Sequence, residues 1–327
     1  MSRFVLRRAL WSLWVVAVVM SLVFALVYAV GDPAVATLGP RAKHEQLQNF
    51  RQHHGLDQPL WRQFGGYLGI APCHRPASPS FEGGGFCGLL QGDLGESFRE
   101  GEAVSRVIAV RLPRTLLLGA MATFFELCIG LTLGIVAAVW RHSWFDTSMM
   151  LLAFAGISTP TFLSGLLFLH FFAFRLGWFP VGGYGFDALA HVQHALLPAL
   201  TLAITGAATY ARIMRSEMID CLGSDYVRTA HAKGLHPLRV VLVHGARNAL
   251  LPVVTLLGLQ LSVLVSGAII TESIFAWPGI GRLAIESIYN LDAPTILAVV
   301  LMASLAVQAG NFLADITVAA LDPRLRM

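Results

Sequence analysis

Long apolar segments constrain the fold of this chain, because a run of about 20 apolar residues is long enough to cross a bilayer core as a helix. Hydrophobic residues make up 56% of the sequence and charged residues only 13%, whereas a soluble domain carries about 25% charged residues. None of the apolar segments alternates with the period of two of a barrel strand. The sequence therefore predicts an all-α membrane protein with six transmembrane helices, at about Leu10–Val30, Thr115–Trp140, Thr147–Ala173, Leu196–Ile213, Leu250–Thr271 and Thr295–Ala319.

The positions of Lys and Arg in the short loops predict the orientation of these helices. If both termini are cytoplasmic, the cytoplasmic segments hold most of the basic residues, and the two short outer loops hold only Arg175 and Arg282. The net charge of +4 therefore reports topology, and it is no argument for nucleic-acid binding. The first apolar run is longer than the core of a signal peptide, so we expect an uncleaved span.

This topology divides the chain into a membrane core and one long outer segment. The first helix ends at residue 30, and an extracytoplasmic segment follows with an irregular, Pro- and Gly-rich insertion near 71–90. The other five spans form the core. The predicted divisions are 1–30, 31–114, 115–319 with a cytoplasmic loop at 214–249, and a cytoplasmic tail at 320–327.

The cytoplasmic loop contains the most distinctive segment, SDYVRTAHAKGLHPLRVVLVHGARNALLP from Ser224. Its first part predicts a short basic helix, Asp225–Lys233, that Ser224 or Asp225 could cap and that Gly234 would end in the left-handed conformation. Small residues at Ala230, Ala232 and Gly234 would allow another backbone to approach closely. A preformed basic helix held between two spans predicts a docking element for a soluble partner.

Two motifs and one charge stand out within the spans. Gly130 and Gly134 form a GxxxG spacing that lets helices approach closely, and Pro160 predicts a kink in the third span. Ordinary packing explains either motif equally well. Glu126 lies about midway along the second span, where an ionisable group indicates function by default. Lining a pathway and pairing structurally within the bundle both remain open for Glu126.

The four cysteines divide between the membrane core and the outer segment. Cys73 and Cys87 both lie in the outer segment, where a disulfide could persist. A metal site at Cys73, His74 and Cys87 is the alternative, but it lacks a fourth ligand at a recognisable spacing. The chain has no GxxxxGK[ST], HExxH or GxSxG motif, so we expect a non-catalytic subunit that binds no nucleotide, metal or other cofactor.

Many stretches of this sequence, in this order, resemble the inner-membrane permeases of binding-protein-dependent ABC importers. The resemblance is to the B-type permease of the dipeptide, oligopeptide and nickel group, and it covers nearly the whole chain except about Ala71–Leu90. The matching stretches are RFVLRRAL, Gly31-Asp32-Pro33, GLDQPL from Gly55, GDLG from Gly92 with Ser97-Phe98, LPRT from Leu112, LGWFPVGG from Leu176, HALLPALTLA from His194, YARIMRSEM from Tyr210, DYVRTAHAKGL from Asp225, RNALLPVVTLLGLQL from Arg247, FAWPGIGRL from Phe275 and LDPRLR from Leu321.

The resemblance implies a type I importer bundle in the bacterial inner membrane, and it implies partners. They are a second, homologous permease that completes a heterodimer, two cytoplasmic ATPases that carry ATP and Mg, an extracytoplasmic substrate-binding protein, and membrane lipid. The short basic helix Asp225–Lys233, called the coupling helix below, would lie in a groove of an ATPase. The residues implied to make this contact are Asp225, Tyr226, Arg228, Thr229, Ala230, Ala232, Lys233 and Gly234. The wider importer family has Glu-Ala-Ala where this chain has Arg228, Thr229 and Ala230, and the peptide-type subgroup shares that departure.

The resemblance favours short peptides as the substrate and leaves related substrates open. Nickel chelates, glutathione-like molecules and peptide antibiotics use the same scaffold, since specificity lies largely in the binding protein. A self-contained ion-coupled carrier would need a charged relay or inverted repeats, and the sequence has neither. An intramembrane enzyme would need a catalytic pair, which Glu126 and Asp315 do not form convincingly.

Overall fold

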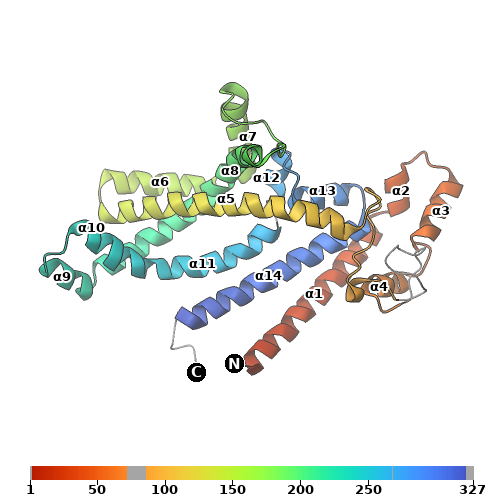
Figure 1. The fold of residues 1–327 in the computed structure, drawn as a ribbon, viewed down its shortest axis with the longest axis horizontal. Coiled ribbons are helices and arrows are strands. Elements are labelled where there is room, and N and C mark those ends of the chain that lie inside the picture. The colour runs from red at the N-terminus through yellow and green to blue at the C-terminus, as the bar shows by residue number, and fades with distance from the viewer. Residues whose placement is uncertain (1, 72–85, 267, 322–327) are drawn as a thin grey trace. The chain divides into compact units, whose positions relative to one another are not determined.

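The structure, a computed structural model, describes residues 2–71, 86–266 and 268–321, and it is helical with no strand among them (Figure 1). Within these residues, five helices are long and apolar enough to cross a membrane, and a sixth span results if one bent pair is counted. The chain divides into two compact units, which are Met1–Pro113 with Leu283–Leu305 and Arg114–Arg282 with Ala306–Met327. The prediction of an all-α membrane protein with about six spans is confirmed.

The first unit contains the outer segment and the helices that anchor it. Buried Met20 and Phe24 of α1 pack against Leu297 of α14, and Phe64 and Tyr67 of α4 cover this core. The elements of this unit are α1 (Ser2–Val30), α2 (Pro33–Leu38), α3 (His44–His53), α4 (Leu60–Leu68), η1 (Leu89–Gln91), the start of α5 (Val104–Val139), most of α13 (Ile280–Tyr289) and the first part of α14 (Ala293–Leu321). The outer segment therefore rests on two spans through aromatic side chains.

A buried carboxylate attaches the outer segment to the start of α14. Asp292 is 2% exposed and accepts hydrogen bonds from Ser97 Oγ at 2.5 Å and the Phe98 backbone N–H at 3.0 Å. Thr295 Oγ1 donates to the same side chain at 2.7 Å. A buried charge is tolerated only when it is hydrogen-bonded. The role of Ser97 and Phe98 is therefore to donate hydrogen bonds to the buried Asp292 carboxylate.

The second unit is arranged around α8 (Ala188–Leu222), which contacts α6, α7, α11 and η3 (Figure 1). Its other helical elements are most of α5, α6 (Trp144–Ser158), α7 (Thr161–Phe168), the π-helical η2 (Leu169–Arg175), α9 (Asp225–Ala232), α10 (Pro237–Arg239), the π-helical η3 (Val240–Ala246), α11 (Arg247–Ser266) and α12 (Ile269–Ile274). The short helices α9 and α10 lie at one end of the bundle of α5, α6, α8 and α11.

The two glycines of the GxxxG motif bring α5 against α8. A Cβ atom added at Gly130 would lie 2.7 Å from the carbonyl oxygen of Ala207, and one at Gly134 would lie 2.7 Å from that of Ala211. Any larger residue would therefore force the two backbones apart. The close approach that the GxxxG spacing predicts is confirmed.

The predicted third span is broken around Pro160, where the sequence predicts a kink. The chain breaks between α6 and α7, and the two arms meet at 102°. Thr159 is extended, with φ −80° and ψ 123°, because the ring of a following proline disfavours the helical conformation. Pro160 was expected to bend this span, and the actual bend is much sharper than a kink.

Three helices extend beyond the predicted apolar limits. Helix α5 begins at Val104 and passes through Pro113, α8 covers Ala188–Leu222, and a continuous helical run begins at Pro237. The sequence analysis placed the starts of these spans at Thr115, Leu196 and Leu250. Hydropathy marks only the part of a helix that suits hydrocarbon, whereas intrahelical hydrogen bonds continue into the polar ends.

A two-point ion pair fixes the start of α6 on α8. Arg215 donates from Nε to Asp146 Oδ1 at 2.5 Å and from Nη2 to Asp146 Oδ2 at 2.7 Å. The Asp146 side chain is nearly buried, and it also accepts from the His142 backbone N–H at 3.0 Å. The sequence analysis did not single out Asp146, although it is the only acidic residue between Glu126 and Asp187.

We expect Arg215→Ala to lower the free energy of unfolding by about 3 kcal/mol, because it leaves a buried carboxylate without its partner. Thermal denaturation of the detergent-solubilised chain measures the change. The double variant Asp146→Asn with Arg215→Ala should recover part of the loss, since no unpaired charge then remains. Equal stability of wild type and Arg215→Ala would contradict this account.

Candidate functional site

The coupling helix forms where the sequence predicts it, as α9 from Asp225 to Ala232. The backbone N–H of Gly234 donates to His231 O at 2.9 Å, and that of Leu235 donates to Ala230 O at 3.3 Å. Gly234 has φ +74°, so the helix ends in a left-handed glycine as predicted. Ser224 occupies the N-cap position as predicted, but its hydroxyl donates to Cys221 O at 2.5 Å and makes no capping hydrogen bond to α9.

One face of α9 packs against its own chain. Val227, Ala230 and Val240 form a buried cluster, which Leu222 and Leu235 cover. Ala230 is only 5% exposed, so it cannot offer a contact surface as the sequence analysis expected. Its small side chain instead lets α9 lie close to the start of η3.

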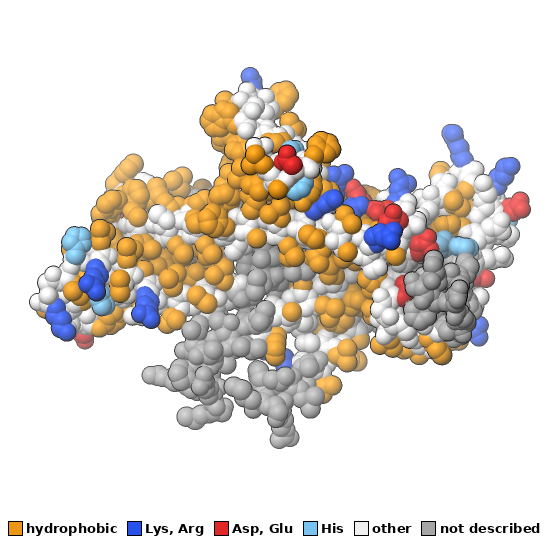
Figure 2. All heavy atoms as spheres, in the orientation of Figure 1, with side chains coloured by type: hydrophobic (Ala, Val, Ile, Leu, Met, Phe, Trp, Pro, Cys, Tyr) orange, Lys and Arg blue, Asp and Glu red, His pale blue; other side chains and the backbone are white. Residues whose placement is uncertain are grey.

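The other face of α9 is exposed. It carries seven of the eight residues that the resemblance implied for ATPase contact, which are Asp225, Tyr226, Arg228, Thr229, Ala232, Lys233 and Gly234, and it also carries His231. Arg228 and Asp225 pair at 3.3 Å while their side chains are 75% and 97% exposed, and such a surface pair adds little to stability. Figure 2 shows basic and histidine side chains gathered at the end of the second unit where α9 and α10 lie. Apolar side chains, in orange, cover the long helices α5, α6 and α8.

The contacts of α9 and η3 connect the exposed face to two long helices. Tyr226 Oη accepts a hydrogen bond from Asn248 Nδ2 of α11 at 3.0 Å. Gly245 of η3 lies so close to α8 that an added Cβ would be 3.1 Å from Leu222 Cδ2 and 3.2 Å from Met218 Cε. Helix α9 is therefore linked to α11 by a hydrogen bond and to α8 through η3, which packs against both α8 and α9.

Glu126, the candidate pathway residue, lines a cavity of about 360 Å³ inside the second unit. Glu126 is 4% exposed, and it lies directly against Gly206 of α8, where a Cβ atom would overlap its carboxyl group. None of the described lining residues is Lys or Arg. They are Thr115, Leu118, Gly119, Ala122, Thr123, Glu126, Thr161, Leu202, Thr205, Gly206, Thr209, Tyr210, Leu256, Ala268 and Glu272.

Glu272, a second carboxylate in this cavity, was missed by the sequence analysis. Its side chain is fully buried, and it accepts from Thr115 Oγ1 at 2.9 Å and from the Arg282 backbone N–H at 3.0 Å. Thr115 in turn accepts from the Ile280 backbone N–H at 2.7 Å. Burial raises the pKa of Glu272, although these donors oppose that shift. Its oxygens thus hold the FAWPGIGRL loop in place.

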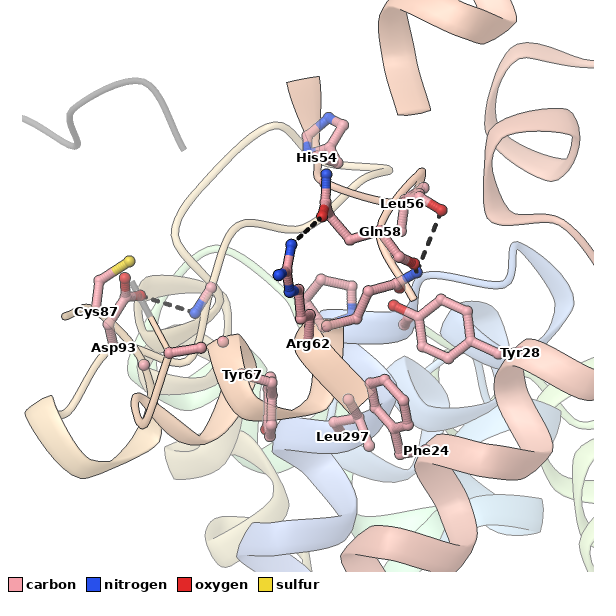
Figure 3. A pocket seen from close by; sticks show the side chains of 18 of the residues that line it. Phe24, Tyr28, His54, Leu56, Gln58, Arg62, Tyr67, Cys87, Asp93 and Leu297 are labelled. Carbon is pink, nitrogen blue, oxygen red and sulfur yellow. Dashed lines mark hydrogen bonds between the residues drawn. The ribbon is translucent and has the colours of Figure 1, made fainter. Parts of the chain in front are cut away.

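A larger cavity of about 590 Å³ lies within the first unit (Figure 3). Phe24 and Tyr28 of α1 and Leu297 of α14 form its apolar side, and α4 supplies Arg62 and Tyr67. In the described structure the Tyr67 hydroxyl is buried without a hydrogen-bond partner, and burial raises its pKa. This hollow belongs to the segment that we expect on the extracytoplasmic side.

The predicted Cys73–Cys87 disulfide involves a residue outside the described part of the chain, namely Cys73, so it stays a prediction. Cys128 and Cys221 are free thiols. The described residues contain no group of three or more His, Cys, Asp or Glu side chains that could hold a metal ion.

Two sequence families match this chain. The family described as binding-protein-dependent transport system inner membrane component matches residues 130–327, and its N-terminal counterpart matches residues 1–119. The chain therefore belongs to the inner-membrane components of binding-protein-dependent transport systems. It is a permease subunit of an ABC importer of the dipeptide and oligopeptide group, and it resides in the inner membrane as a multi-pass protein.

Similar proteins of known name support the same class. The glutathione transport system permease protein GsiC of Escherichia coli (strain K12) is 39% identical over 100% of this chain and 99% of its own length. The protein of the same name from Salmonella choleraesuis (strain SC-B67) is 41% identical over the same shares. The inward-facing methionine ABC transporter MetNI shares the fold, with a TM-score of 0.56 at 19% identity over 67% of this chain and 97% of that one.

The predicted resemblance to importer permeases is thus confirmed. A permease of this class is a transport component that works with ATPase and substrate-binding partners. The individual contact residues on α9 and the role of Glu126 stay predictions.

Ala230 and Ala232 provide a matched test of the two faces of α9. We expect Ala230→Leu to loosen α9, because overpacking a filled cluster costs about 1–3 kcal/mol, whereas Ala232→Leu should leave α9 in place. Limited proteolysis of the loop in the purified chain measures the difference. Equal cleavage rates for the two variants would show that Ala230 is not held against Val227 and Val240.

Proposed function

We propose that this chain forms one half of the translocation pathway of an ATP-driven importer for short peptides, with glutathione-like tripeptides as the first substrates to test. The observation that carries the proposal is the two-faced α9. Its inner face is fixed to α8 and η3 through Val227, Ala230 and Val240, while its outer face leaves Arg228 and Lys233 exposed.

The coupling mechanism follows from these contacts. A cytoplasmic ATPase receives the exposed face of α9, with the basic groups opposite acidic groups on the ATPase. ATP and Mg bind to the ATPases and not to this chain, whose sequence has no phosphate-binding motif. Closure of the ATPase pair then displaces α9, and its contacts pass the displacement to α8 and α11.

The energy for alternating access comes from the partners. Reversing a conformational preference from 1:99 to 99:1 takes about 5.5 kcal/mol of differential binding. The few charges within the spans of this chain do not supply that amount, and binding and hydrolysis of ATP do. Rocking of the helical bundle about the pathway is the rigid-body motion that such transporters use.

The assembly comprises this chain, a homologous second permease, two ATPases and a soluble binding protein. Both termini and α9 face the cytoplasm in this arrangement, which the distribution of Lys and Arg in short loops supports. The binding protein docks on the outer side, against parts of 31–114 and of Phe275–Asn290. The pathway, with Glu126 in its wall, lies between the two permeases.

The names of the two GsiC relatives give glutathione as the molecule that their systems transport, and this supports a tripeptide substrate for the present chain. Glutathione is itself a modified tripeptide, so it falls within the peptide class that the resemblance favours. Transporters of nickel chelates and of peptide antibiotics share this scaffold, so these molecules serve as competitors in the uptake experiment described next.

Purification of the tagged chain in mild detergent, followed by mass spectrometry, tests the assembly. We expect two ATPases and a second permease to accompany it, and uptake of labelled glutathione or a short peptide by cells that carry all subunits. Recovery of the chain alone in several detergents would favour a self-contained carrier.

We expect Gly234→Trp, or the double variant Arg228→Glu with Lys233→Glu, to abolish ATP-dependent uptake while the chain still inserts and folds. The bulky ring or the reversed charges obstruct the exposed face, and none of these three residues contributes to the buried cluster under α9. Gly234→Asn is the control, because asparagine tolerates the left-handed conformation. Full uptake by Gly234→Trp would argue against this docking surface.

A further inference from the structure

Helix α4 exposes large apolar side chains although it lies outside the predicted spans. Leu60 is 52% exposed and Trp61 is 69% exposed, and these two residues begin the helix. Arg62 beside them is exposed as well. An exposed apolar patch with a polar rim marks a site of contact with a protein partner or with a membrane. The start of α4 is therefore a candidate contact surface.

The buried face of α4 shows how far along α1 this helix lies. Phe64 packs against Phe24 of α1 with 4.9 Å between the two ring centroids, and the same cluster contains Leu297 of α14. Phe24 lies six residues before the end of α1 at Val30, so it is about 9 Å inside the helix end. Both α1 and α14 form candidate membrane spans at these positions. Helix α4 thus packs against the sides of two spans and not above their ends, which places its exposed face at the boundary of the bilayer.

The side chains of this surface suit the boundary between lipid and water. The Arg62 guanidinium carbon lies 5.0 Å from the centroid of the Trp61 ring. Within the described residues Arg62 pairs with no carboxylate, and it donates to the neutral Gln58 Oε1 at 3.5 Å. Tryptophan is enriched at the level of the lipid headgroups, and arginine keeps its charged group in water while its stem lies along apolar surface. Arg62 is therefore available to an anion at the membrane surface.

The cavity of about 590 Å³ in the first unit joins this basic group to an apolar wall. Figure 3 shows Arg62 and Gln58 toward one side of the cavity, and Phe24 and Leu297 toward the other. A volume of this size falls in the range of small-ligand sites. A cavity that is cationic at one end and apolar at the other fits an amphipathic anion.

The charged residues that line this cavity favour an anion at Arg62. Arg62 is the one Lys or Arg among the described lining residues. The acidic residue among them, Asp93, accepts from the Gly95 backbone N–H at 2.8 Å, and Figure 3 shows Asp93 next to Cys87 and apart from Arg62. Arg62 is therefore the group in this cavity that attracts a negatively charged ligand.

We propose that the start of α4 lies in the membrane interface and that Arg62, with the cavity beside it, binds an anionic phospholipid. The lipid phosphate meets the Arg62 guanidinium, which can donate two hydrogen bonds to it, and an acyl chain lies along Phe24 and Leu297. The position of α4 favours lipid over a soluble partner, because two membrane spans form the apolar wall of the cavity. The proposed orientation of the chain assigns this site to the outer leaflet, and the rest of the inference does not depend on that orientation.

Fluorescence of Trp61 tests the inference in nanodiscs that contain the full chain and the subunits that purify with it. The difference between wild type and Trp61→Phe reports on Trp61 alone. The probes are brominated phosphatidylglycerol and brominated phosphatidylcholine, which quench tryptophan on contact. We expect both lipids to quench Trp61, with phosphatidylglycerol effective at about one-fifth of the mole fraction, as for one basic residue near an anionic lipid.

Arg62 and Arg41 supply a matched pair of variants, because both are exposed arginines of the outer segment and only Arg62 lines the cavity. Each variant is measured with and without Trp61→Phe. Arg62→Ala should remove the preference for phosphatidylglycerol while both lipids still quench Trp61. Arg62→Lys should keep part of the preference, because lysine retains the charge without the planar set of donors. Arg41→Ala should behave as wild type does.

Absence of quenching of Trp61 by both lipids would overturn the inference, and it would show that another protein surface covers α4. Equal quenching by the two lipids in wild type would also overturn it, as would loss of the preference in Arg41→Ala. Release of phosphatidylglycerol by millimolar glycerol 3-phosphate would assign the site to free phosphate instead of lipid. The measurement involves no transport, so its failure leaves the proposed function standing, and absence of peptide uptake would leave this lipid site standing.

Discussion

Close packing on α8 is the interaction on which the second unit depends. Lipid tails are as apolar as Leu, so helices in a membrane associate through tight packing and not through the hydrophobic effect. Gly130 and Gly134 allow α5 to touch the α8 backbone, and the Asp146–Arg215 pair holds α6 on it. One side of α8 thereby forms a wall of the Glu126 cavity, and its last residues lead directly into α9.

This arrangement joins α9 to the cavity through a single element. Helix α8 has 35 residues, and its part from Gly206 in the cavity wall to Leu222 beneath α9 is about 24 Å long. Helices are stiff along their axes, so displacement at one end is felt at the other. If α9 docks on an ATPase as proposed, the contacts that fix α9 to its own chain are as important for transport as its exposed residues.

The two carboxylates of the cavity, Glu126 and Glu272, have different surroundings. Glu272 uses its oxygens to hold Thr115 and the loop before Arg282, and Gly279 leaves it the space to do so, since a Cβ at Gly279 would lie 2.5 Å from its carboxyl group. Glu126 shares the cavity with an unsatisfied hydroxyl and no basic residue among the described lining. Residue type alone does not distinguish Glu126 from Glu272, since both are glutamates.

The sequence alone determined the features that depend on local chemistry, namely the membrane spans and the end of α9. Apolar run length predicted the spans because helices must satisfy their backbone groups in hydrocarbon, and Gly234 predicted the end of α9 because few other residues adopt its conformation. Tertiary structure decided what depends on contacts between distant segments. It placed Ala230 inward against Val240, paired Asp146 with Arg215, and turned the break at Pro160 through 102°, because the burial and direction of a side chain depend on neighbours that are remote in sequence.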